Sequence, residues 1–401
     1  MYIITKLWDN VNHYKVLNFY ILVALLLDLN FNHTKNVITM KKIILITSFY
    51  LFLLSSVFGQ FVQTPNGFRI RTGVNLAIWL SQSEKRGPER EKFITEKDIE
   101  LLAGLGFDHV RLPIDEVQFW DEGGNREEEA FRLMHQAIRW SLKNGLKVIV
   151  DLHIIRSHYF NAASNALWTD PAEQEKLVQI WRKLSAELKQ YPNDQVAYEL
   201  MNEAVANDHQ DWNKLIFRLH KSIREIEPER TIVTGSNKWQ GTETFPFLKV
   251  PGNDPNIILS FHYYRPFGFT HYKAPWTQVK SYKGTVRYPG EVVSREDQAA
   301  DPAYFKELQW PYGYWDKEVM LKDIRFAIES AQKMNLPLYC GEFGVYYTAP
   351  KEDALRWYSD LTDIFRENNI AFAHWDYKTT FGIIAGNGKP VMPVIQLLVK
   401  K

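Results

Sequence analysis

The chain has 401 residues, which permits either one large barrel or two smaller domains. With 48 basic and 47 acidic side chains it has a net charge of +1, so it lacks a net field that would attract nucleic acid or an anionic membrane surface. Cys340 is the only cysteine, which excludes an intrachain disulfide. The charge balance favours an uncharged partner. The aromatic share of 14% provides side chains that can pack against a partner with flat apolar faces.

The amino-terminal part has the pattern of a secretory signal peptide. Met40 is followed by two lysines, an apolar run over residues 43–54, and small residues that end before Gln60, the expected cleavage point. The apolar run is shorter than the ~20 residues that span a bilayer, so we expect no stable membrane association. These features predict a secreted or periplasmic protein with a signal peptide over residues 40–59.

Residues 1–39 precede this signal and contain a further apolar stretch over residues 19–29. Because a signal peptide acts at the start of a chain, we expect Met40 to be the initiator and residues 1–39 to be a leader that is not translated. A double-hydrophobic anchor is the alternative. In either case the folded part is expected to begin near Gln60 and to form a single domain over residues 60–401.

From Gln60 onward, short apolar strands alternate with amphipathic helices. Strands are predicted over residues 70–75, 109–112, 147–153, 196–201, 231–235, 257–263, 337–342 and 370–375. Helices are predicted over residues 95–105, 127–144, 171–189, 211–226, 315–334 and 351–369. Residues 236–256 are rich in proline and glycine and show no long helix, and only a short tail is expected after Trp375.

Eight strands that alternate with helices predict a parallel sheet, and eight is the number that closes into a (β/α)8 TIM barrel. An open, doubly wound sheet is the alternative architecture. No glycine-rich phosphate turn follows the first predicted strand, which disfavours nucleotide binding. The predicted fold class is therefore α/β, as a (β/α)8 barrel.

Two of the predicted strands end in a carboxylate. The segment VAYELMNE, residues 196–203, is mostly apolar until it reaches Asn202 and Glu203, and LYCGEFG, residues 338–344, repeats the arrangement with Glu342. A carboxylate at the end of a buried strand is costly to desolvate, so it needs partners or a chemical task. One such strand can be explained by a glutamate that faces solvent. Two apolar strands that each end in a carboxylate are what a double-carboxylate hydrolase requires.

Further polar and aromatic side chains follow other predicted strands, and the residues after each strand of a parallel barrel converge at one face. Taken singly, each has a structural explanation, such as an ion pair, a hydrogen-bonded core histidine or core packing. Taken together, they predict one polar cluster with two acids and an aromatic floor, made of Asn75, Arg111, His153, Asn202, Glu203, His262, Tyr264, Glu342 and Trp375.

On these motifs the chain resembles the family 5 glycoside hydrolases, over roughly residues 68–393. Six motifs occur in the expected order: RLPI at Arg111, DLH at His153, LMNE at Glu203, FHYY at His262, GEFG at Glu342 and HWDY at Trp375. The resemblance implies a retaining barrel enzyme with its acid/base after the fourth strand and its nucleophile after the seventh. Those two positions are Glu203 and Glu342.

The resemblance also implies how the two acids differ. Arg111 and Tyr264 would hydrogen-bond Glu342 and hold it ionised, since positive charge and donors favour a carboxylate. Burial and the neighbouring negative charge would raise the pKa of Glu203, so that it keeps a proton for the leaving oxygen.

Other members of the cluster would hold the sugar. Asn202 would bind the 2-hydroxyl, His153 and His262 would line the site, and Trp375 would support the ring. The two-carboxylate reaction requires no metal and no cofactor. His153 and His158 lie close together in HIIRSH, but no third ligand is obvious, so we expect no metal site.

Substrate contacts are expected from loops. Asp376 and Tyr377 are expected to extend the aromatic floor. A long loop over residues 265–314 follows the sixth strand, and its aromatic content argues against disorder and suggests that it walls one side of the cleft; it contains Phe267, Phe269, His271, Tyr272, Trp276, Tyr282, Tyr288 and Trp310. The candidate substrate-binding residues are Asn75, Trp79, Trp168, Trp239, Trp276 and Asp376.

The leading hypothesis is a secreted endo-β-1,4-glucanase of the cellulase type, acting as a monomer on a β-linked polysaccharide or oligosaccharide, with no nucleic-acid partner. A β-mannanase, a xyloglucanase or a mixed-linkage glucanase is the alternative, because the loops choose the sugar while the catalytic cluster is shared. A carbohydrate-binding barrel that has lost activity is a hypothesis from another class. The presence of both acids together with Arg111, Asn202 and Tyr264 disfavours it.

Overall fold

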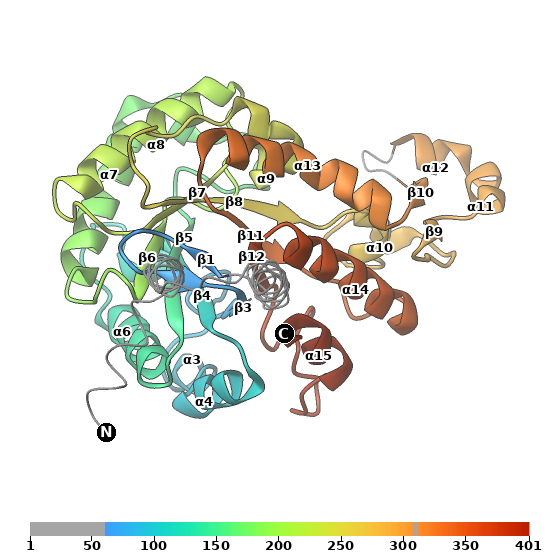
Figure 1. Ribbon diagram of the computed structural model, residues 1–401, viewed down its shortest axis with the longest axis horizontal. Helices are drawn as coiled ribbons and strands as arrows, with labels where there is room; N and C mark the ends of the chain where they lie inside the picture. Colours follow the sequence, from blue (N-terminus) through green and yellow to red (C-terminus); the bar gives the residue numbers. More distant parts are fainter. Residues whose placement is uncertain (1–60, 308–311, 401) are drawn as a thin grey trace, which may run out of the picture. The chain divides into compact units, whose positions relative to one another are not determined.

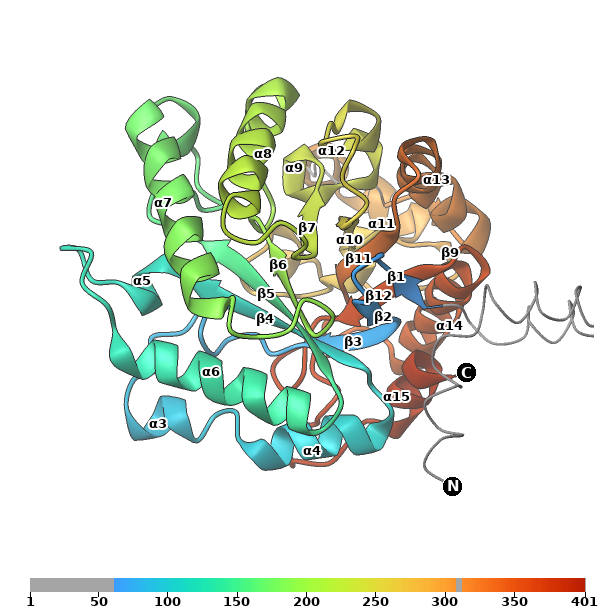
Figure 2. The same cartoon turned by 60° about the vertical axis from the view of Figure 1, so that its left-hand side comes forward.

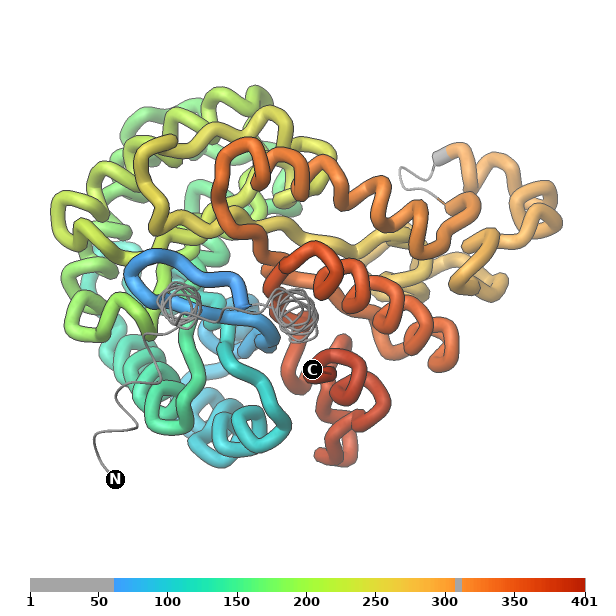
Figure 3. The backbone as a smooth tube through the Cα atoms, in the orientation of Figure 1, coloured from blue at the N-terminus to red at the C-terminus, as the bar shows by residue number. Residues whose placement is uncertain are grey.

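The computed structural model describes residues 61–307 and 312–400 (Figures 1 and 3). The expected leader over residues 1–39, the signal peptide over residues 40–59, the cleavage point at Gln60, and Trp310 lie outside the described residues. In the part that is described, no helix has both the length and the apolar character needed to cross a membrane.

Eight parallel strands close into a barrel, which confirms the predicted (β/α)8 architecture. The strands follow the order β11-β12-β3-β4-β5-β6-β7-β8, and β8 pairs with β11 to close the ring. Each predicted strand is present with small shifts at its ends. The strands are β3 (Thr72–Asn75), β4 (His109–Asp115), β5 (Lys147–Ile154), β6 (Val196–Glu199), β7 (Ile232–Gly235), β8 (Ile257–Tyr263), β11 (Leu338–Phe343) and β12 (Ile370–His374).

A hairpin closes the amino-terminal end of the barrel. It consists of β1 (Val62–Gln63) and β2 (Arg69–Ile70), which pair antiparallel. Its apolar side chains Val62, Phe68 and Ile70 form one buried cluster with residues of six barrel strands: Ile149, Ala197, Val233, Ile258, Tyr339, Ala371 and Ala373. Apolar packing fills this end. Because the barrel strands are all parallel, the polar residues that follow them lie at the opposite, carboxyl-terminal end.

Long amphipathic helices surround the strands, and α6, α7 and α8 lie outside β4, β5 and β6 (Figure 2). The α7 helix begins as its sequence predicts, because the Asp170 side chain accepts a hydrogen bond from the Ala172 backbone N–H and Pro171 occupies the first turn. The long helices are α4 (Glu96–Leu105), α6 (Glu128–Lys143), α7 (Pro171–Leu188), α8 (His209–Arg224), α13 (Lys317–Met334) and α14 (Lys351–Glu367).

Shorter helices complete the ring. As predicted, the connection from β7 to β8 has no long helix, only α9 (Asn237–Gln240) and a 3-10 helix, Thr242–Phe247. The prediction of a mere tail after the last strand is wrong, because α15 (Met392–Val399) buries Ile395 and Leu398 in the main core. Its apolar run is too short for periodicity to distinguish a helix from a strand. The remaining short helices near the barrel are α3 (Pro88–Glu91), α5 (Glu116–Phe119) and the 3-10 helix Ala166–Trp168.

The long segment between β8 and α13 has secondary structure of its own, and Figure 1 shows α11 and α12 at its outer edge, beyond α10. Among its described aromatic residues, Phe269, Tyr272, Tyr282 and Tyr288 are buried, in agreement with the expectation that its aromatic content argues against disorder, whereas Trp276 and Tyr314 are exposed. The Tyr288 hydroxyl donates to Asp360 of α14 at 2.8 Å. The segment contains α10 (Phe267–Thr270), the 3-10 helix Gln278–Ser281, β9 (Gly290–Glu291), α11 (Arg295–Ala300), α12 (Pro302–Glu307) and β10 (Tyr314–Trp315).

Candidate active site

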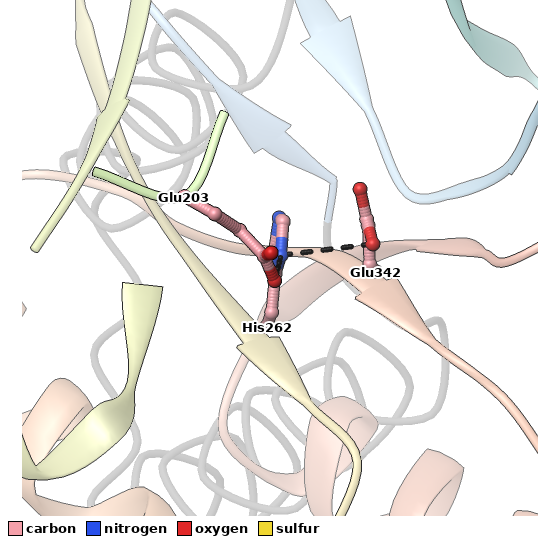
Figure 4. A group of neighbouring side chains, drawn as sticks. All are labelled: Glu203, His262 and Glu342. Carbon is pink, nitrogen blue, oxygen red and sulfur yellow. Dashed lines mark hydrogen bonds and ion pairs between the residues drawn. The ribbon is translucent and has the colours of Figure 1, made fainter. Parts of the chain in front are cut away.

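Glu203 and Glu342 face each other at the carboxyl-terminal end of the barrel, with His262 between them (Figure 4). Glu203 comes after β6, whereas Glu342 and His262 belong to β11 and β8. The His262 Nδ1 atom lies 2.9 Å from Glu203 Oε1 and 3.7 Å from Glu342 Oε2. One oxygen of each carboxyl group and a ring nitrogen of His262 all lie within 4.8 Å of one another. The two acids predicted from distant strands therefore share one site.

Arg111 supplies the positive charge of the site. It has no exposed surface, and it forms ion pairs with Glu342 through Nη1 at 2.7 Å, with Glu199 through Nε at 2.6 Å and with Asp151 through Nη2 at 3.0 Å. Burial by itself would lower the pKa of Arg111, but the nearby carboxyl groups of Asp151 and Glu199 raise it well above its ordinary value. Arg111 is therefore charged throughout the pH range in which a carboxyl group titrates.

Both oxygens of Glu342 have a hydrogen-bond donor. Arg111 Nη1 donates to Oε1, and the hydroxyl of Tyr264 donates to Oε2 at 3.0 Å. Burial raises the pKa of Glu342, while Arg111 and His153 act in the opposite direction. These contacts hold the carboxyl group in one orientation and oppose the effect of burial on its pKa.

Glu203 has a stronger tendency to hold a proton. Burial raises its pKa well above the ordinary value, and the negative charge of Glu342 raises it further. Environments that push the pKa values of two neighbouring carboxyl groups apart are typical of an acid and a nucleophile in one site. The Glu203 backbone is in the left-handed region with φ of 45°, a conformation that costs a non-glycine residue roughly 1–2 kcal/mol.

The predicted sugar-binding side chains lie around this pair. The Trp375 ring stacks on His153, with centroids 5.6 Å apart and planes at 12°. Burial lowers the pKa of His153 to about 4, so the ring is neutral at pH 7. Asn202 accepts from Arg111 through Oδ1 at 2.9 Å, and its buried Nδ2 has no hydrogen-bond partner among the described residues. That amide group is a donor available to a substrate hydroxyl.

Two predicted substrate contacts are wrong because their side chains are fully buried and form hydrogen bonds within the protein. Trp79 has no exposed surface, and its Nε1 donates to the Arg90 carbonyl at 2.8 Å. Asp376 is also fully buried, and it accepts from the Thr379 backbone N–H at 2.6 Å, so it stabilises its own loop. Tyr377 is buried as well, so neither Asp376 nor Tyr377 extends the aromatic floor.

Asn75 is another predicted substrate contact, but in the structure its side chain bonds to other residues of the site. It has no exposed surface, donates to the Gly341 carbonyl at 2.9 Å and accepts from Arg111 Nη1 at 3.0 Å. Its amide is used to position Arg111 rather than to reach a ligand. Trp168 is partly buried and packs edge-on against His158 and Trp212, and its role as a sugar platform stays a prediction.

Trp239 and Trp276 are the predicted platforms that face solvent, with 49% and 57% of their surface exposed. Trp239 donates through Nε1 to the Phe160 carbonyl at 2.9 Å. Trp276 packs near Phe381, whose ring centroid is 6.0 Å from that of Tyr264 in the site. The exposed ring of Trp276, in the long segment after β8, is thus linked through Phe381 to Tyr264, which donates to Glu342.

Three polar residues of the site were not predicted: Asp151, Glu199 and Gln240. A local signal existed for two of them. Asp151 lies two residues before His153, so both side chains point to the same face of β5, and Glu199 interrupts an otherwise apolar strand. Burial raises the pKa of Asp151 to about 7, although Arg111 opposes this. Gln240 lies in a connection without regular periodicity, and nothing in its local sequence singles it out.

A parallel (β/α)8 barrel with two facing carboxyl groups beside a buried arginine defines a glycoside hydrolase. The family model described as cellulase, glycosyl hydrolase family 5, matches residues 72–380. The chain belongs to this family.

Named relatives agree with this assignment. The chain is 36% identical over 330 residues to endoglucanase C of Acetivibrio thermocellus, covering 80% of this chain and 95% of that protein. It is 31% identical over 302 residues to cellodextrinase A of Ruminococcus flavefaciens, covering 75% and 83%. A solved hyperthermophilic endo-β-1,4-glucanase in complex with substrate has 25% identity and a TM-score of 0.67, covering 83% of this chain and 97% of that one.

Proposed function

We propose that this protein is an exported endo-β-1,4-glucanase that hydrolyses β-glucan by double displacement. The observation that carries the proposal is the closeness of Glu203 and Glu342, whose nearest ligand oxygens lie within 4.8 Å of each other. Retaining glycosidases have carboxyl groups ~5–5.5 Å apart, whereas inverting enzymes need roughly 6.5–9.5 Å to admit a water. The endoglucanase relatives support the choice of glucan.

In the first step Glu342 attacks the anomeric carbon while Glu203 donates its proton to the glycosidic oxygen. The C–O bond to the leaving sugar breaks, and a covalent glycosyl ester forms on Glu342. Arg111 and Tyr264 hold the attacking carboxylate, and the free amide of Asn202 is placed to bind the 2-hydroxyl as the transition state develops.

In the second step Glu203, now ionised, removes a proton from a water that attacks the same carbon. The ester bond to Glu342 breaks, and the product leaves with its original β configuration. His262 contacts both acids and is neutral, since burial lowers its pKa well below the ordinary value. Glu203, His262 and Glu342 have the donor atoms of a candidate metal site, but the proposed reaction uses both carboxyl groups directly and Arg111 provides the positive charge.

The signal-peptide pattern over residues 40–59 supports the proposal that the protein is exported. Amino-terminal sequencing of the protein recovered outside the cytoplasm is expected to begin at Gln60 or within a few residues of it. Recovery of the protein only from the cytoplasm would remove this part of the proposal.

A β-mannanase is the second candidate, and a specific finding favours keeping it. One solved structure with 25% identity and a TM-score of 0.66 is that of Thermotoga maritima Cel5A in complex with mannotriose. Reducing-sugar release from carboxymethylcellulose, barley β-glucan, xyloglucan, galactomannan and xylan separates the candidates. The proposal expects the highest kcat/KM on carboxymethylcellulose, and a higher value on galactomannan would replace glucan by mannan.

The kcat/KM of the enzyme is expected to have a bell-shaped pH profile. Activity is lost at low pH, where Glu342 takes up a proton, and at high pH, where Glu203 loses its proton. Burial raises the pKa of both groups, so both limbs are shifted above the ~4.3 of an ordinary glutamate, and the apparent values belong to the coupled pair. A dinitrophenyl cellobioside needs no acid, so the alkaline limb should vanish with this substrate. An unchanged alkaline limb would exclude Glu203 as its source.

Replacement of Trp276 by alanine is expected to raise KM for cellohexaose roughly three- to tenfold, because a stacked aromatic ring contributes about 0.5–1.5 kcal/mol beyond its buried area. The KM for cellotriose should change less. Tyr314→Ala is the matched control, since Tyr314 is an equally exposed aromatic residue in β10 of the same segment. Equal effects of the two substitutions, or no effect of Trp276→Ala, would remove Trp276 from the substrate-binding residues.

A further inference from the structure

In the connection after β7, three consecutive residues next to Glu203 adopt a left-handed backbone conformation. Lys238, Trp239 and Gln240 have φ angles of 58°, 59° and 52°, and none of them is glycine. The Trp239 backbone N–H donates to the Ala204 carbonyl at 3.2 Å, and Gln240 is 1% exposed. A conformation that L-residues disfavour is thus adopted three times in a row, next to the residue that carries the proton.

The Gln240 side chain bridges a hydrogen-bond donor, the Glu203 backbone N–H, and an acceptor, the Glu199 carboxyl group. Its Oε1 accepts a hydrogen bond from the Glu203 backbone N–H at 2.9 Å, and its Nε2 donates to Glu199 Oε1 at 3.2 Å and to Ser260 Oγ at 3.0 Å. The backbone N–H requires an acceptor and the carboxylate requires a donor. A side-chain amide of this length provides both at once.

Through Gln240 the backbone of Glu203 is connected to the carboxyl group of Glu342 by one path of hydrogen bonds. The path runs from the Glu203 backbone to Gln240, then to Glu199, whose other oxygen accepts from Arg111 Nε at 2.6 Å, and then from Arg111 Nη1 to Glu342. Every side chain in the path between the two catalytic residues is buried. The path therefore fixes the position of Glu203 relative to the partner of the nucleophile.

The last residue of β7 leaves room for this glutamine. A Cβ at Gly235 would lie 2.4 Å from Cγ of Gln240 and 2.5 Å from the backbone carbonyl oxygen of Ser260, so glycine at this position admits both the Gln240 side chain and the backbone of β8. The backbone of Glu203 is itself left-handed and leaves the regular strand after Glu199, so it depends on side-chain partners for its orientation.

We propose that Gln240 is a positioning residue for the acid/base: it holds the Glu203 backbone in its left-handed conformation and couples its position to the Arg111–Glu342 pair. The inference rests on the proposed role of Glu203 and deepens it. Gln240 does not touch the reacting atoms. Because Arg111 and Tyr264 hold Glu342 directly, loss of Gln240 is expected to act mainly on the proton transfer to the leaving group and much less on the attack by Glu342.

The test is Gln240→Met, which keeps the length of the side chain and removes both amide groups. For phenyl cellobioside, a poor leaving group that needs the acid, kcat/KM is expected to fall on the order of 10- to 100-fold, because small displacements of a catalytic group are costly. For 2,4-dinitrophenyl cellobioside it should fall less than about threefold, since that leaving group departs without a proton. An equal fall with both substrates, or no fall, would overturn the proposal.

Two further variants separate positioning from folding. Thr244→Val removes hydrogen bonds of Thr244 Oγ1 to Ser236, Asn237 and Gly241, which stabilise the same connection without touching Glu203, and it should keep the wild-type ratio of the two substrates. Gln240→Glu, buried beside Glu199, takes up a proton and can still accept from Glu203 and donate to Glu199, so it should restore most of the ratio. A changed ratio in Thr244→Val, or no restoration by Gln240→Glu, contradicts the proposal.

The result is distinguishable from a failure of the proposed function. If Glu203→Ala itself shows no dependence on the leaving group, the role of Glu203 is wrong. If Glu203→Ala shows that dependence and Gln240→Met does not, only the positioning role of Gln240 is wrong.

Discussion

Glu342→Ala is expected to lower kcat on glucan by roughly 10⁵-fold, because removal of a nucleophile abolishes the covalent route and leaves only the contribution of binding. Affinity for cello-oligosaccharides should stay within a fewfold of wild type. Exogenous azide can occupy the space of the missing carboxylate and attack from the same side. The product from an activated β-cellobioside is then expected to be an α-glycosyl azide, which proton NMR identifies.

Glu342→Ala is also expected to fold as well as wild type. Burial raises the folded-state pKa of Glu342, so its ionised form opposes folding, and its stabilising effect is present only at pH below its unfolded pKa and is lost as pH rises through the folded pKa. Arg111 keeps Glu199 and Asp151 as partners after the change. At pH 7 we expect a Tm equal to or above that of wild type. Glu329→Ala, at an exposed position on α13, is the matched control and should alter neither activity nor Tm.

Residual hydrolysis within tenfold of wild type by Glu342→Ala would show that another group attacks the anomeric carbon. A β-glycosyl azide from this variant would show that the two acids have exchanged roles. A fall in Tm of more than a few degrees would show that Glu342 stabilises the fold, contrary to the direction of its pKa shift.

Glu203→Ala is expected to lower kcat/KM on glucan by about 10²- to 10⁴-fold, the usual contribution of general acid catalysis. The same variant should keep nearly wild-type kcat/KM on 2,4-dinitrophenyl cellobioside, because this leaving group needs no proton. Hydrolysis of the glycosyl ester is then slow, since no base activates water. Azide requires no base, so it should restore turnover and give a β-glycosyl azide.

The identity of the azide product decides the assignment for Glu203. An α-azide, or no rescue by azide, would remove Glu203 from the acid/base role. Glu199→Gln offers a contrasting variant, because Glu199 is fully buried and its two oxygens are bound by Arg111 and Gln240. The Glu199→Gln substitution is expected to lower activity by weakening the ion pair with Arg111, and azide should not restore it. Restoration by azide would mean that azide does not act by replacing the water that Glu203 activates.

The sequence predicted the barrel because its signals are local. Each of the eight strands is a short apolar run, and helix starts such as Asp170 with Pro171 are set by adjacent residues. The two acids were also predictable, since a carboxylate at the end of an apolar strand stands out against its neighbours. The α15 helix was missed because its apolar run is short. A short helix is stabilised mainly by tertiary packing, which Ile395 and Leu398 provide here by packing into the core.

The predictions that failed concern side chains whose surroundings come from distant segments. Trp79 and Asp376 follow strands, as true site residues do, but Trp79 is covered by the α3 region and Asp376 bonds within its own loop. Asn75 was correctly placed at the site, yet its amide is occupied by Arg111 and the carbonyl of Gly341. Position along a strand indicates which end of the barrel a residue lies at, and it does not indicate whether other segments bury that side chain.

By itself, the sequence determined the order of the eight barrel strands and the six long helices and the pair Glu203 and Glu342, because periodicity and strand ends are properties of neighbouring residues. Only the tertiary structure decided that Arg111 has three carboxyl partners, that Gln240 connects Glu203 to them, and that Trp239 and Trp276 remain exposed. These features depend on burial and on hydrogen bonds between segments far apart in the chain, which exist only once the barrel has closed.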